Sequence, residues 1–391
     1  MDADEARVAA ISFTTYSKHL NYGAVLHGWA FQRVLASMGC PSTVIDYVPR
    51  NLDGYSLKFP FLSAGQRRIV PAVRFVLRWA FSFFANLRKC RKFKRFMRDN
   101  LRLTERRYRE RDLVTGNCAL DRFEVFVCEA DVTWKKRPEA PFDRGFLLDF
   151  PAARAKTRVA YAPSLGADPF PPDEEAVFME SVRGFAAVST REREGAEYVG
   201  RLLGREIPWV LDPTLLLAAS DYMRIADAPA GGEPYVLLYT CMRYNLRMVF
   251  EAERYARRLG KRLIEVGNYG INRLLHRHTV VDDAGVGEWL ALFRDADAVI
   301  CNSFHGICFS LIFRKPFYVF SRGAEDTRFL NICRATGLEP RLLPGDGTIP
   351  DTDAPIDFDA VEARLAPLRE RSIAFIRKEI VARAAAEGEG R

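Results

Sequence analysis

A polar segment that begins at Cys301, CNSFHGICFSLIFRKPFYVF, combines the residue types that bind and protonate ligands. The apolar residues that end at Cys301 predict a strand, and those from Gly306 onward predict a helix. Asn302 or Ser303 can cap this helix, whose N-terminus favours an anion. His305 then lies at the carboxyl end of a strand, where open α/β sheets bind ligands. We predict an anion site with His305 as its acid–base group; a capping turn with an incidental histidine is the alternative.

Arg191 and Asp131 are two further charged residues placed to act on a ligand. Arg191 follows the predicted strand Phe185–Ser189, and a guanidinium binds a phosphate or a carboxylate through two parallel hydrogen bonds. The alternative is a solvated arginine at the start of a helix. Asp131 could remove a proton from a hydroxyl group, or it could cap a loop. Trp134 in the same loop is more typical of a packed aromatic than of a sugar platform.

The turn formed by Asn21, Tyr22 and Gly23 precedes the first predicted helix. These residues could reach a ligand, with Tyr22 stacking on a sugar, or they could form a plain strand-to-helix turn. Asp282 and Asp283 are expected to cap the helix that follows them. The eight cysteines include no CxxC pair, and no Cys/His cluster has the spacing of a zinc site. We therefore expect free thiols, no metal and no cofactor.

The elements that must position these residues begin with a strand–helix–strand unit. The apolar run Arg7–Phe13 predicts a buried strand. The spacing of apolar residues then predicts a helix over Ala24–Met38, which Gly39 ends. Thr43–Tyr47 predicts the next strand. Such a unit indicates a parallel sheet.

The rest of the chain continues this alternation in two halves. Residues 66–112 are basic and helical, and they predict an insertion into the first domain. After the Pro- and Gly-rich linker 229–234, a second series of strands and helices begins, and it ends in a long helix, 361–385. We predict two Rossmann-like domains, residues 1–227 and 228–391, that face a cleft. This is the α/β arrangement of a GT-B-like fold, and we expect the ligands in the cleft.

Composition and charge restrict the classes of partner. The 391 residues are 48% hydrophobic and 28% charged, as in globular proteins, and the net charge of +8 favours an anionic partner. The apolar stretch Ile69–Phe84 contains Pro71, Arg74 and Arg78. Each arginine would cost roughly 2.5–3.5 kcal/mol inside a membrane, so we reject a transmembrane helix. The acidic N-terminus lacks the basic region and long apolar stretch of a signal peptide, and we expect a cytoplasmic protein.

The basic segment Lys89–Arg111 has three interpretations. A solvated helix face is the commonest explanation of such a run. Peripheral contact with the anionic inner face of a membrane is the next, because aromatic residues lie beside the basic ones. Nucleic acid is not expected as a partner, because no recognised binding motif accompanies the charge. The neighbouring aromatic residues are Phe75, Trp79, Phe81, Phe83 and Phe84.

Several segments together resemble the polysaccharide pyruvyl transferase family. NSFHG with the following CFSLIFRKPF looks like the C-terminal signature of that family, and GEWLALFRDADAVI is similar to the segment just before it. TTYSKHLNYGAVLHGWAFQ resembles the opening loop and helix of the family. VSTREREGAEYVGRLLG resembles its middle segment, and VLDPTLLL follows as the family pattern requires. These segments occur in the family's order between about residue 8 and residue 345.

The resemblance implies a reaction and the residues that carry it. Members of the family transfer the enolpyruvyl carbons of phosphoenolpyruvate to a sugar as a cyclic ketal and release phosphate. The motif histidine of the family falls on His305, and its motif arginine falls on Arg191. Phosphoenolpyruvate is then the donor substrate, no metal is required, and the acceptor is a sugar or lipid-linked glycan of a surface polysaccharide or exopolysaccharide.

One segment departs from the family pattern. Where the family commonly has Gly-Ser-Asp-x-x-Trp, this chain has Glu129-Ala130-Asp131-Val132-Thr133-Trp134. Glu129 adds bulk and charge where the loop is expected to turn tightly, so a non-catalytic glycan-binding relative stays an alternative. The other alternative is a GT-B glycosyltransferase that uses a nucleotide sugar. That enzyme needs a carboxylate for the ribose near the His305 loop, and Glu325 is a candidate.

Overall fold

The computed structural model describes most of the chain, with backbone only for residues 69–81 and 388–389. The described residues are 6–15, 20–50, 69–116, 119–136, 141–166, 169–228, 232–241, 244–267, 270, 272–323, 327–352 and 354–389.

A first parallel sheet is built from the N-terminal half of the chain. Its five strands have the order β2-β1-β5-β6-β7, and each pairs with its neighbours in parallel. The predicted strand–helix–strand unit is confirmed, with helix α1 (Tyr22–Ser37) between β1 and β2. The inner strands are apolar along their whole length because a parallel sheet is covered on both faces. The strands are β1 (Val8–Ile11), β2 (Ser42–Val44), β5 (Val125–Glu129), β6 (Thr157–Tyr161) and β7 (Ala187–Val188).

A second parallel sheet is built from the C-terminal half. Its six strands have the order β10-β9-β8-β11-β12-β13. The predicted boundary at residue 227 falls between helix α7 (Ala219–Met223) and β8, and therefore between the two sheets. Two parallel α/β sheets in sequence confirm the predicted GT-B-like class. The strands are β8 (Tyr235–Tyr239), β9 (Arg262–Val266), β10 (Thr279–Val281), β11 (Ala298–Cys301), β12 (Phe317–Phe320) and β13 (Leu342–Leu343).

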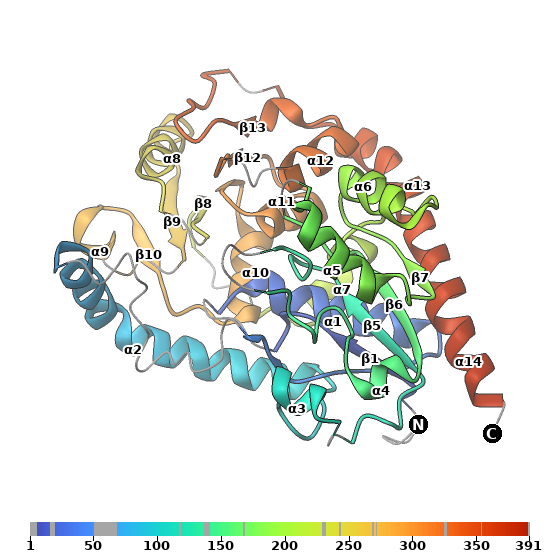
Figure 1. The fold of residues 1–391 in the computed structure, drawn as a ribbon. Helices are drawn as coiled ribbons and strands as arrows, with labels where there is room; N and C mark the ends of the chain where they lie inside the picture. The colour runs from blue at the N-terminus through green and yellow to red at the C-terminus, as the bar shows by residue number, and fades with distance from the viewer. Residues whose placement is uncertain are drawn as a thin grey trace.

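Helices and short elements cover and connect the sheets (Figure 1). Strands β10 and β13 and helices α5 and α12 were not predicted from the sequence. The helices of the first half are α3 (Glu110–Val114), α4 (Pro151–Arg154), α5 (Pro172–Val182), α6 (Arg193–Leu203) and the 3-10 turn η4 (Pro213–Leu216). Those of the second half are α8 (Leu246–Arg258), α9 (Asn272–Leu275), α10 (Val286–Asp295), α11 (Phe304–Ile312), α12 (Thr327–Thr336) and η5 (Glu339–Arg341). Strands β3 (Tyr47–Val48) and β4 (Tyr108–Arg109) form a separate parallel pair.

Helix α1 joins the two sheets through a shared apolar core. Tyr22 at its start stacks on Trp289 of α10, with ring centroids 5.1 Å apart and planes inclined by 12°. The Tyr22 hydroxyl donates a hydrogen bond to the Ala284 carbonyl. Farther along α1, Trp29 packs on Tyr222, which in turn contacts Phe309 of α11. The continuous core holds the carboxyl ends of strands from both sheets at fixed positions.

The basic insertion forms the helix α2 (Ile69–Asn100), which lies against the second sheet as well as the first (Figure 1). Its residues Phe93 and Phe96 are buried. Lys92 forms an ion pair with Glu288 of α10 at 2.7 Å, and Arg88 pairs with Asp283 at 2.6 Å. Part of the basic charge predicted for residues 66–112 is therefore used in contacts within the molecule. Among the described helices, none has a stretch both long enough and apolar enough to span a bilayer.

The C-terminal helix returns to the first sheet (Figure 1). Helix α13 (Phe358–Ile376), a π-helical turn η6 (Arg377–Val381) and α14 (Ala382–Glu389) continue one another, and they cover the helix predicted over 361–385. The backbone N–H of Leu211 donates to the Ser372 hydroxyl at 2.9 Å, and Thr157 donates to Glu387 at 3.1 Å. The last helix belongs to the second domain in sequence, but it packs on the first.

Candidate active site

His305 lies at the junction that the sequence predicted, one residue into α11 after the end of β11. Its side chain is almost fully buried, and its Nε2 atom is 3.7 Å from Oδ2 of Asp212. This nitrogen has no hydrogen-bond partner among the described residues. Gly23 at the start of α1 lies against the imidazole ring, where any Cβ atom would clash with it. The glycine therefore lets α1 approach close enough to form one wall of the site.

Arg191 follows β7, as predicted, and it is buried rather than solvated. Its Nη1 donates to Oδ2 of Asp212 at 2.9 Å, and its Nε donates to Oε1 of Glu192 at 3.3 Å. The guanidinium also lies over the Phe304 ring, 4.4 Å from its centroid. Burial would lower the pKa of Arg191, but Glu192, Asp212 and Asp131 together raise it above its ordinary value. The site therefore contains a permanent cation.

Asp131 lies between Arg191 and a second histidine, His27. Its Oδ1 is 3.8 Å from Nη2 of Arg191, and its Oδ2 is 3.9 Å from Nε2 of His27. Ala130 and Asp131 have φ angles of 41° and 52°, a left-handed conformation that non-glycine residues rarely adopt. Burial would raise the pKa of Asp131, but Arg191, His27 and His305 lower it. The strained turn thus aims an ionised carboxylate into the site.

His27 and Glu129 form a buried pair that was not predicted from the sequence. His27 Nδ1 is 2.8 Å from Oε1 of Glu129, and both side chains have no exposed surface. The His27 ring stacks near that of His305, with centroids 5.9 Å apart and planes inclined by 21°. The sequence spacing could have identified His27, because this residue lies one helical turn after Gly23 and so on the same face of α1.

The expectation that Glu129 disturbs the turn is wrong. Glu129 is the last residue of β5, the residues with left-handed backbone come after it, and its carboxylate is occupied by His27. Burial would lower the pKa of His27, but the charge and hydrogen bond of Glu129, with Asp131 and Asp212 nearby, raise it above its ordinary value of 6.5. The residue that departs from the family pattern is therefore the main group that raises the pKa of His27.

We expect Glu129→Gln to destabilise the protein in a pH-dependent way. Because the pKa of His27 is higher in the folded state than in the unfolded state, protonation of His27 stabilises the folded protein. This stabilisation is complete below the pKa of the unfolded state, and it is lost as pH rises through the pKa of the folded state. Loss of a charged hydrogen bond should cost about 1.5–3 kcal/mol at pH values below the ordinary pKa of histidine, and the difference from wild type should shrink as pH rises through the folded-state pKa of His27. Urea unfolding across this range measures the effect.

The matched control is Glu124→Gln. Glu124 is also buried, and it accepts a hydrogen bond from Lys156 at 2.6 Å. The control removes a buried ion pair that contains no histidine, so the pH dependence that we expect from His27 should be missing from it. A pH-independent loss in Glu129→Gln would show that His27 is neutral in the folded protein.

Arg328, at the start of α12, brings a second buried guanidinium to the site. Burial, with the nearby cations Arg191 and Arg322, lowers the pKa of Arg328 to about 10, so that it stays charged near neutral pH. Arg328 and Glu192 both line a cavity of about 240 Å³ that adjoins the site. Nothing in the sequence marked Arg328, because its helix was not predicted.

Four buried nitrogen atoms in this region have no hydrogen-bond partner among the described residues. They are Nε2 of His27, Nη2 of Arg191, Nε2 of His305 and Nε of Arg328. Leaving a buried donor unpaired costs about 1–3 kcal/mol, so a cluster of such atoms is uncommon without a ligand. An anionic ligand with several acceptor oxygens would satisfy them.

Three residues of the NSFHG segment shape the backbone around His305. Asn302 Oδ1 accepts a hydrogen bond from the backbone N–H of Cys241 at 2.8 Å, which fixes the loop after β8. Ser303 occupies the N-cap position of α11, although its hydroxyl makes no capping bond to the helix. A Cβ on Gly306 would come within 2.7 Å of the Cys301 sulfur, so this glycine allows helix and strand to pack closely.

The turn before α1 positions the helix and does not offer a sugar platform. Asn21 accepts a hydrogen bond from the Gly23 N–H and so caps α1. Tyr22 is only 2% exposed and stacks on Trp289. The prediction that Tyr22 stacks on a sugar is therefore wrong, because its ring is already covered on the apolar core.

The remaining candidates also have partners within the fold. Trp134 is fully buried and donates to the Phe146 carbonyl, as expected of a packed aromatic. Asp282 pairs with Arg273, and Asp283 pairs with Arg88. Neither aspartate caps α10, whose N-cap is Gly285. Glu325 lies outside the described residues.

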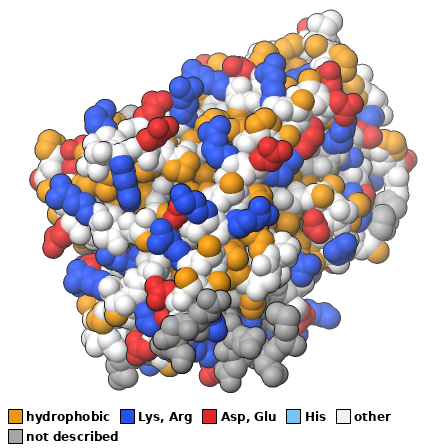
Figure 2. All heavy atoms as spheres, turned by 90° about the vertical axis from the view of Figure 1, so that its right-hand side faces the viewer, with side chains coloured by type: hydrophobic (Ala, Val, Ile, Leu, Met, Phe, Trp, Pro, Cys, Tyr) orange, Lys and Arg blue, Asp and Glu red, His pale blue; other side chains and the backbone are white. Residues whose placement is uncertain are grey.

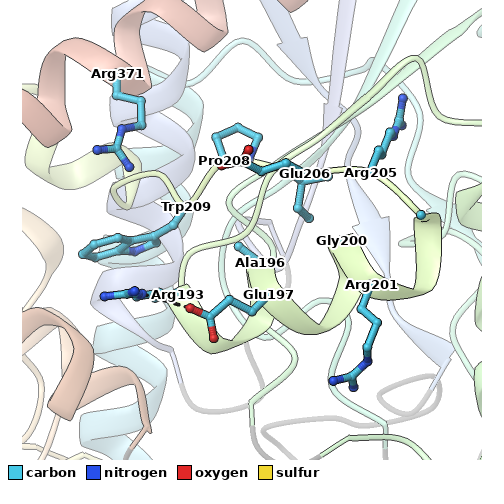
Figure 3. A pocket seen from close by; sticks show the side chains of 12 residues that line it. Arg193, Ala196, Glu197, Gly200, Arg201, Arg205, Glu206, Pro208, Trp209 and Arg371 are labelled. Atoms are coloured by element: carbon cyan, nitrogen blue, oxygen red, sulfur yellow. Dashed lines mark hydrogen bonds and ion pairs between the residues drawn. The ribbon is translucent and has the colours of Figure 1, made fainter.

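A groove of about 850 Å³ runs along α6 (Figure 3). Trp209 lies at one end with Arg193 and Arg371, and Arg201 and Arg205 lie at the other. The Trp209 indole donates to the Arg191 carbonyl at 2.8 Å, so the groove and the site share a wall. Acidic side chains are interspersed among the basic ones on this face of the molecule (Figure 2).

Comparison with known proteins identifies a family for this chain. Residues 21–323 match the family model for polysaccharide pyruvyl transferase. A comparison with curated protein sequences gives no match.

Two solved structures illustrate the likeness in fold. The UDP-GlcNAc 2-epimerase from Methanocaldococcus jannaschii is 10% identical, with a TM-score of 0.43 over 92% of this chain and 91% of the epimerase. The E. coli ADP-heptose LPS heptosyltransferase II is also 10% identical, with a TM-score of 0.42 over 93% of this chain and 99% of that enzyme. Likeness at this level says nothing of the ligands that this chain binds.

Proposed function

The chain belongs to the polysaccharide pyruvyl transferase family, and from this membership we propose that it transfers the pyruvyl group of phosphoenolpyruvate to a sugar as a ketal. The sugar would be part of a surface-polysaccharide precursor. The observation that carries the proposal is the cluster of four buried, unpartnered nitrogen atoms on His27, Arg191, His305 and Arg328. Phosphoenolpyruvate carries a carboxylate and a phosphate, and both are the acceptors that such donors bind.

In the proposed reaction two sugar hydroxyls become bonded to the central carbon of phosphoenolpyruvate. Its CH2 carbon gains one proton and becomes a methyl group, and phosphate leaves with the other proton. One group must therefore donate a proton to carbon, and another must accept a proton from a hydroxyl. Arg191 and Arg328 would hold the donor's negative charges throughout, because neither guanidinium loses its proton near neutral pH.

We assign the two proton transfers to the two stacked histidines. In spite of burial, Glu129 holds the pKa of His27 above its ordinary value, which favours the protonated form and suits donation to carbon. His305 would accept the hydroxyl proton, and Asp212, 3.7 Å away, would stabilise the imidazolium that forms. The lowered pKa of Asp131, due to Arg191, His27 and His305 in spite of burial, makes this carboxylate a weak base. Asp131 is therefore assigned to orienting Arg191 and His27.

The direct test measures phosphate release. Purified protein would be incubated with phosphoenolpyruvate and a panel of lipid-linked or nitrophenyl sugars, and phosphate and the ketal product would be quantified. We expect both products in equal amounts, with neither formed when the acceptor is left out. Turnover of nucleotide sugars together with none of phosphoenolpyruvate would overturn the proposal in favour of a glycosyltransferase. The non-catalytic alternative loses its basis, because Glu129 has a partner in His27.

We also propose that α2 brings the enzyme to anionic lipid at the inner face of the membrane. Arg91, Lys94 and Arg95 are exposed on this helix, as is Phe84, which is 70% exposed. Each basic residue near an anionic surface contributes about 1 kcal/mol. The variant R91E/K94E/R95E should therefore bind anionic vesicles at least about a hundredfold more weakly at low salt. Co-sedimentation with anionic and neutral vesicles measures this.

Lys92 is left unchanged in this variant because it pairs with Glu288. The control R364E/R377E/K378E changes the same charge on α13 and the adjoining η6, where these three residues are also exposed, and should retain vesicle binding. Salt should release the wild type, because screening limits the attraction to about 10 Å at 0.1 M. A wild type that does not sediment with anionic vesicles even at low salt contradicts the surface role.

A further inference from the structure

A group of metal-ligand side chains lies in the second sheet's half, apart from the candidate active site. Glu253 extends from α8, and His276 and His278 lie in the segment between α9 and β10. One ligand atom from each residue lies within 4.8 Å of the others. Helices α8 and α9 lie to the left of α11 in Figure 1. The cluster is therefore independent of the proposed transferase chemistry.

The three ligand atoms already have the spacing of a metal site. His276 Nδ1 is 3.0 Å and His278 Nδ1 is 3.1 Å from the same oxygen, Oε1 of Glu253. Around a tetrahedral zinc ion with bonds of about 2.0–2.1 Å, neighbouring ligand atoms are about 3.3 Å apart. Each pair of ligand atoms lies within 4.8 Å, so an ion can bind between the three residues once the atoms adjust to this spacing. Both imidazole side chains are at least nine-tenths buried, so they lose little freedom on binding.

The outer nitrogens of both histidines are held as metal-binding histidines usually are. His278 Nε2 is 3.0 Å from Oε2 of Glu265, a buried carboxylate that also accepts hydrogen bonds from Asn272 and Thr240. His276 Nε2 shares a hydrogen bond of 3.0 Å with the Tyr244 hydroxyl. A carboxylate behind a histidine keeps the proton on the outer nitrogen and leaves the inner one free to bind a metal.

Hydrogen bonding alone explains this arrangement less well than a bound ion does. Without an ion, His278 faces a carboxylate oxygen at each of its ring nitrogens. The inner nitrogen of His276 lies against the same Glu253 oxygen that the inner nitrogen of His278 contacts. An ion bound between the three residues would give both inner nitrogens a partner and remove the crowding on that oxygen. The Glu253 side chain is 24% exposed, so solvent can reach the remaining coordination position.

We propose that Glu253, His276 and His278 bind a divalent transition-metal ion, with zinc as the best fit. Two imidazoles and one carboxylate suit zinc, whereas magnesium and calcium prefer sites made of oxygen. The ion would tie α8 to the segment that leads into β10, a structural role. Sequence spacing did not reveal the site, because the His-x-His pair lies 23 residues from Glu253 and no cysteine is involved.

The test uses the full chain and needs no enzyme assay. Protein stripped with a chelator would be titrated with zinc against a chromophoric competitor, and bound metal would be counted by mass spectrometry. We expect one zinc per chain, a cobalt form with the visible absorption of a tetrahedral N/O site, and a Tm raised by about 5 °C at saturating zinc. A wild type that binds no zinc, or binds it with no rise in Tm, overturns the proposal.

Variants separate this site from adventitious binding elsewhere. His276→Ala with His278→Ala should abolish binding of the stoichiometric ion. Glu265→Gln should weaken it by about 10–100-fold, because this residue acts only through His278. His27→Gln, which removes a histidine from the candidate active site, should leave zinc affinity unchanged. Retention of the ion by the double variant, or its loss in His27→Gln, would contradict the assignment. If a variant fails to fold, the cobalt spectrum of the wild type is the test of the proposed metal site.

Discussion

Replacing His305 with alanine should lower turnover of phosphoenolpyruvate by at least about a hundredfold, the low end of general acid–base effects, while the protein stays folded. His305 holds its Nε2 3.7 Å from Asp212 without a hydrogen-bond partner among the described residues, and its ring stacks beside His27. Alanine leaves Asp212 paired with Arg191, so no buried charge is stranded. The kcat for phosphate release and the far-UV circular dichroism spectrum together measure the outcome.

His305→Gln is the informative companion variant. Glutamine keeps a polar group of similar length and can donate a hydrogen bond, but it does not titrate. If His305 moves a proton, the glutamine variant should be as slow as the alanine variant. Recovery of most of the activity in His305→Gln would reduce His305 to a hydrogen-bond donor, and wild-type rates in His305→Ala would remove it from the mechanism.

Arg191→Lys should raise the KM for phosphoenolpyruvate by about 10–100-fold, which corresponds to the loss of about 1.5–3 kcal/mol of charged hydrogen bonding. Lysine keeps a positive charge among Asp212, Glu192 and Asp131, so the fold should survive. It lacks the planar fork, and so it loses the Nη2 donor, which has no hydrogen-bond partner among the described residues. Initial rates at varied donor and fixed acceptor measure the change.

Arg193→Lys is the matched control two residues away. Arg193 is 71% exposed and pairs with Glu197, one helical turn along α6, at 3.0 Å. Its replacement should leave the KM for the donor unchanged. If Arg191→Lys also leaves this constant unchanged, Arg191 serves the fold alone, because its contacts with Asp212 and Glu192 suffice to explain its burial.

The parts of the site that could be predicted are those with local signals. His305 follows an apolar strand and precedes a helix, and Arg191 follows another strand, so each was placed at a strand end before the sheets were known. Asp131 was found through the segment that resembles the Gly-Ser-Asp-x-x-Trp pattern of the family. The alternation of apolar runs with helical spacing also determined the two parallel sheets, because these periods depend only on neighbours within a few residues.

Contacts between distant segments were decided only by the tertiary structure. His27 and Glu129 are 102 residues apart, and they meet because β1 and β5 are neighbours in the sheet. Strand order is not encoded in hydrophobic periodicity. The same limit hid Arg328 and the group of Glu253 with two histidines, and it made Tyr22 look available when it is covered by Trp289.

The sequence by itself therefore determined the class of fold, the family resemblance and the strand ends that carry His305, Arg191 and Asp131. The tertiary structure decided which charges lie together. It showed that Glu129, which departs from the family pattern, is the partner of His27, and that the C-terminal helix packs on the first sheet. The physical reason is that local patterns specify elements, whereas pKa values and ligand sites depend on distances of a few ångströms between elements far apart in the chain.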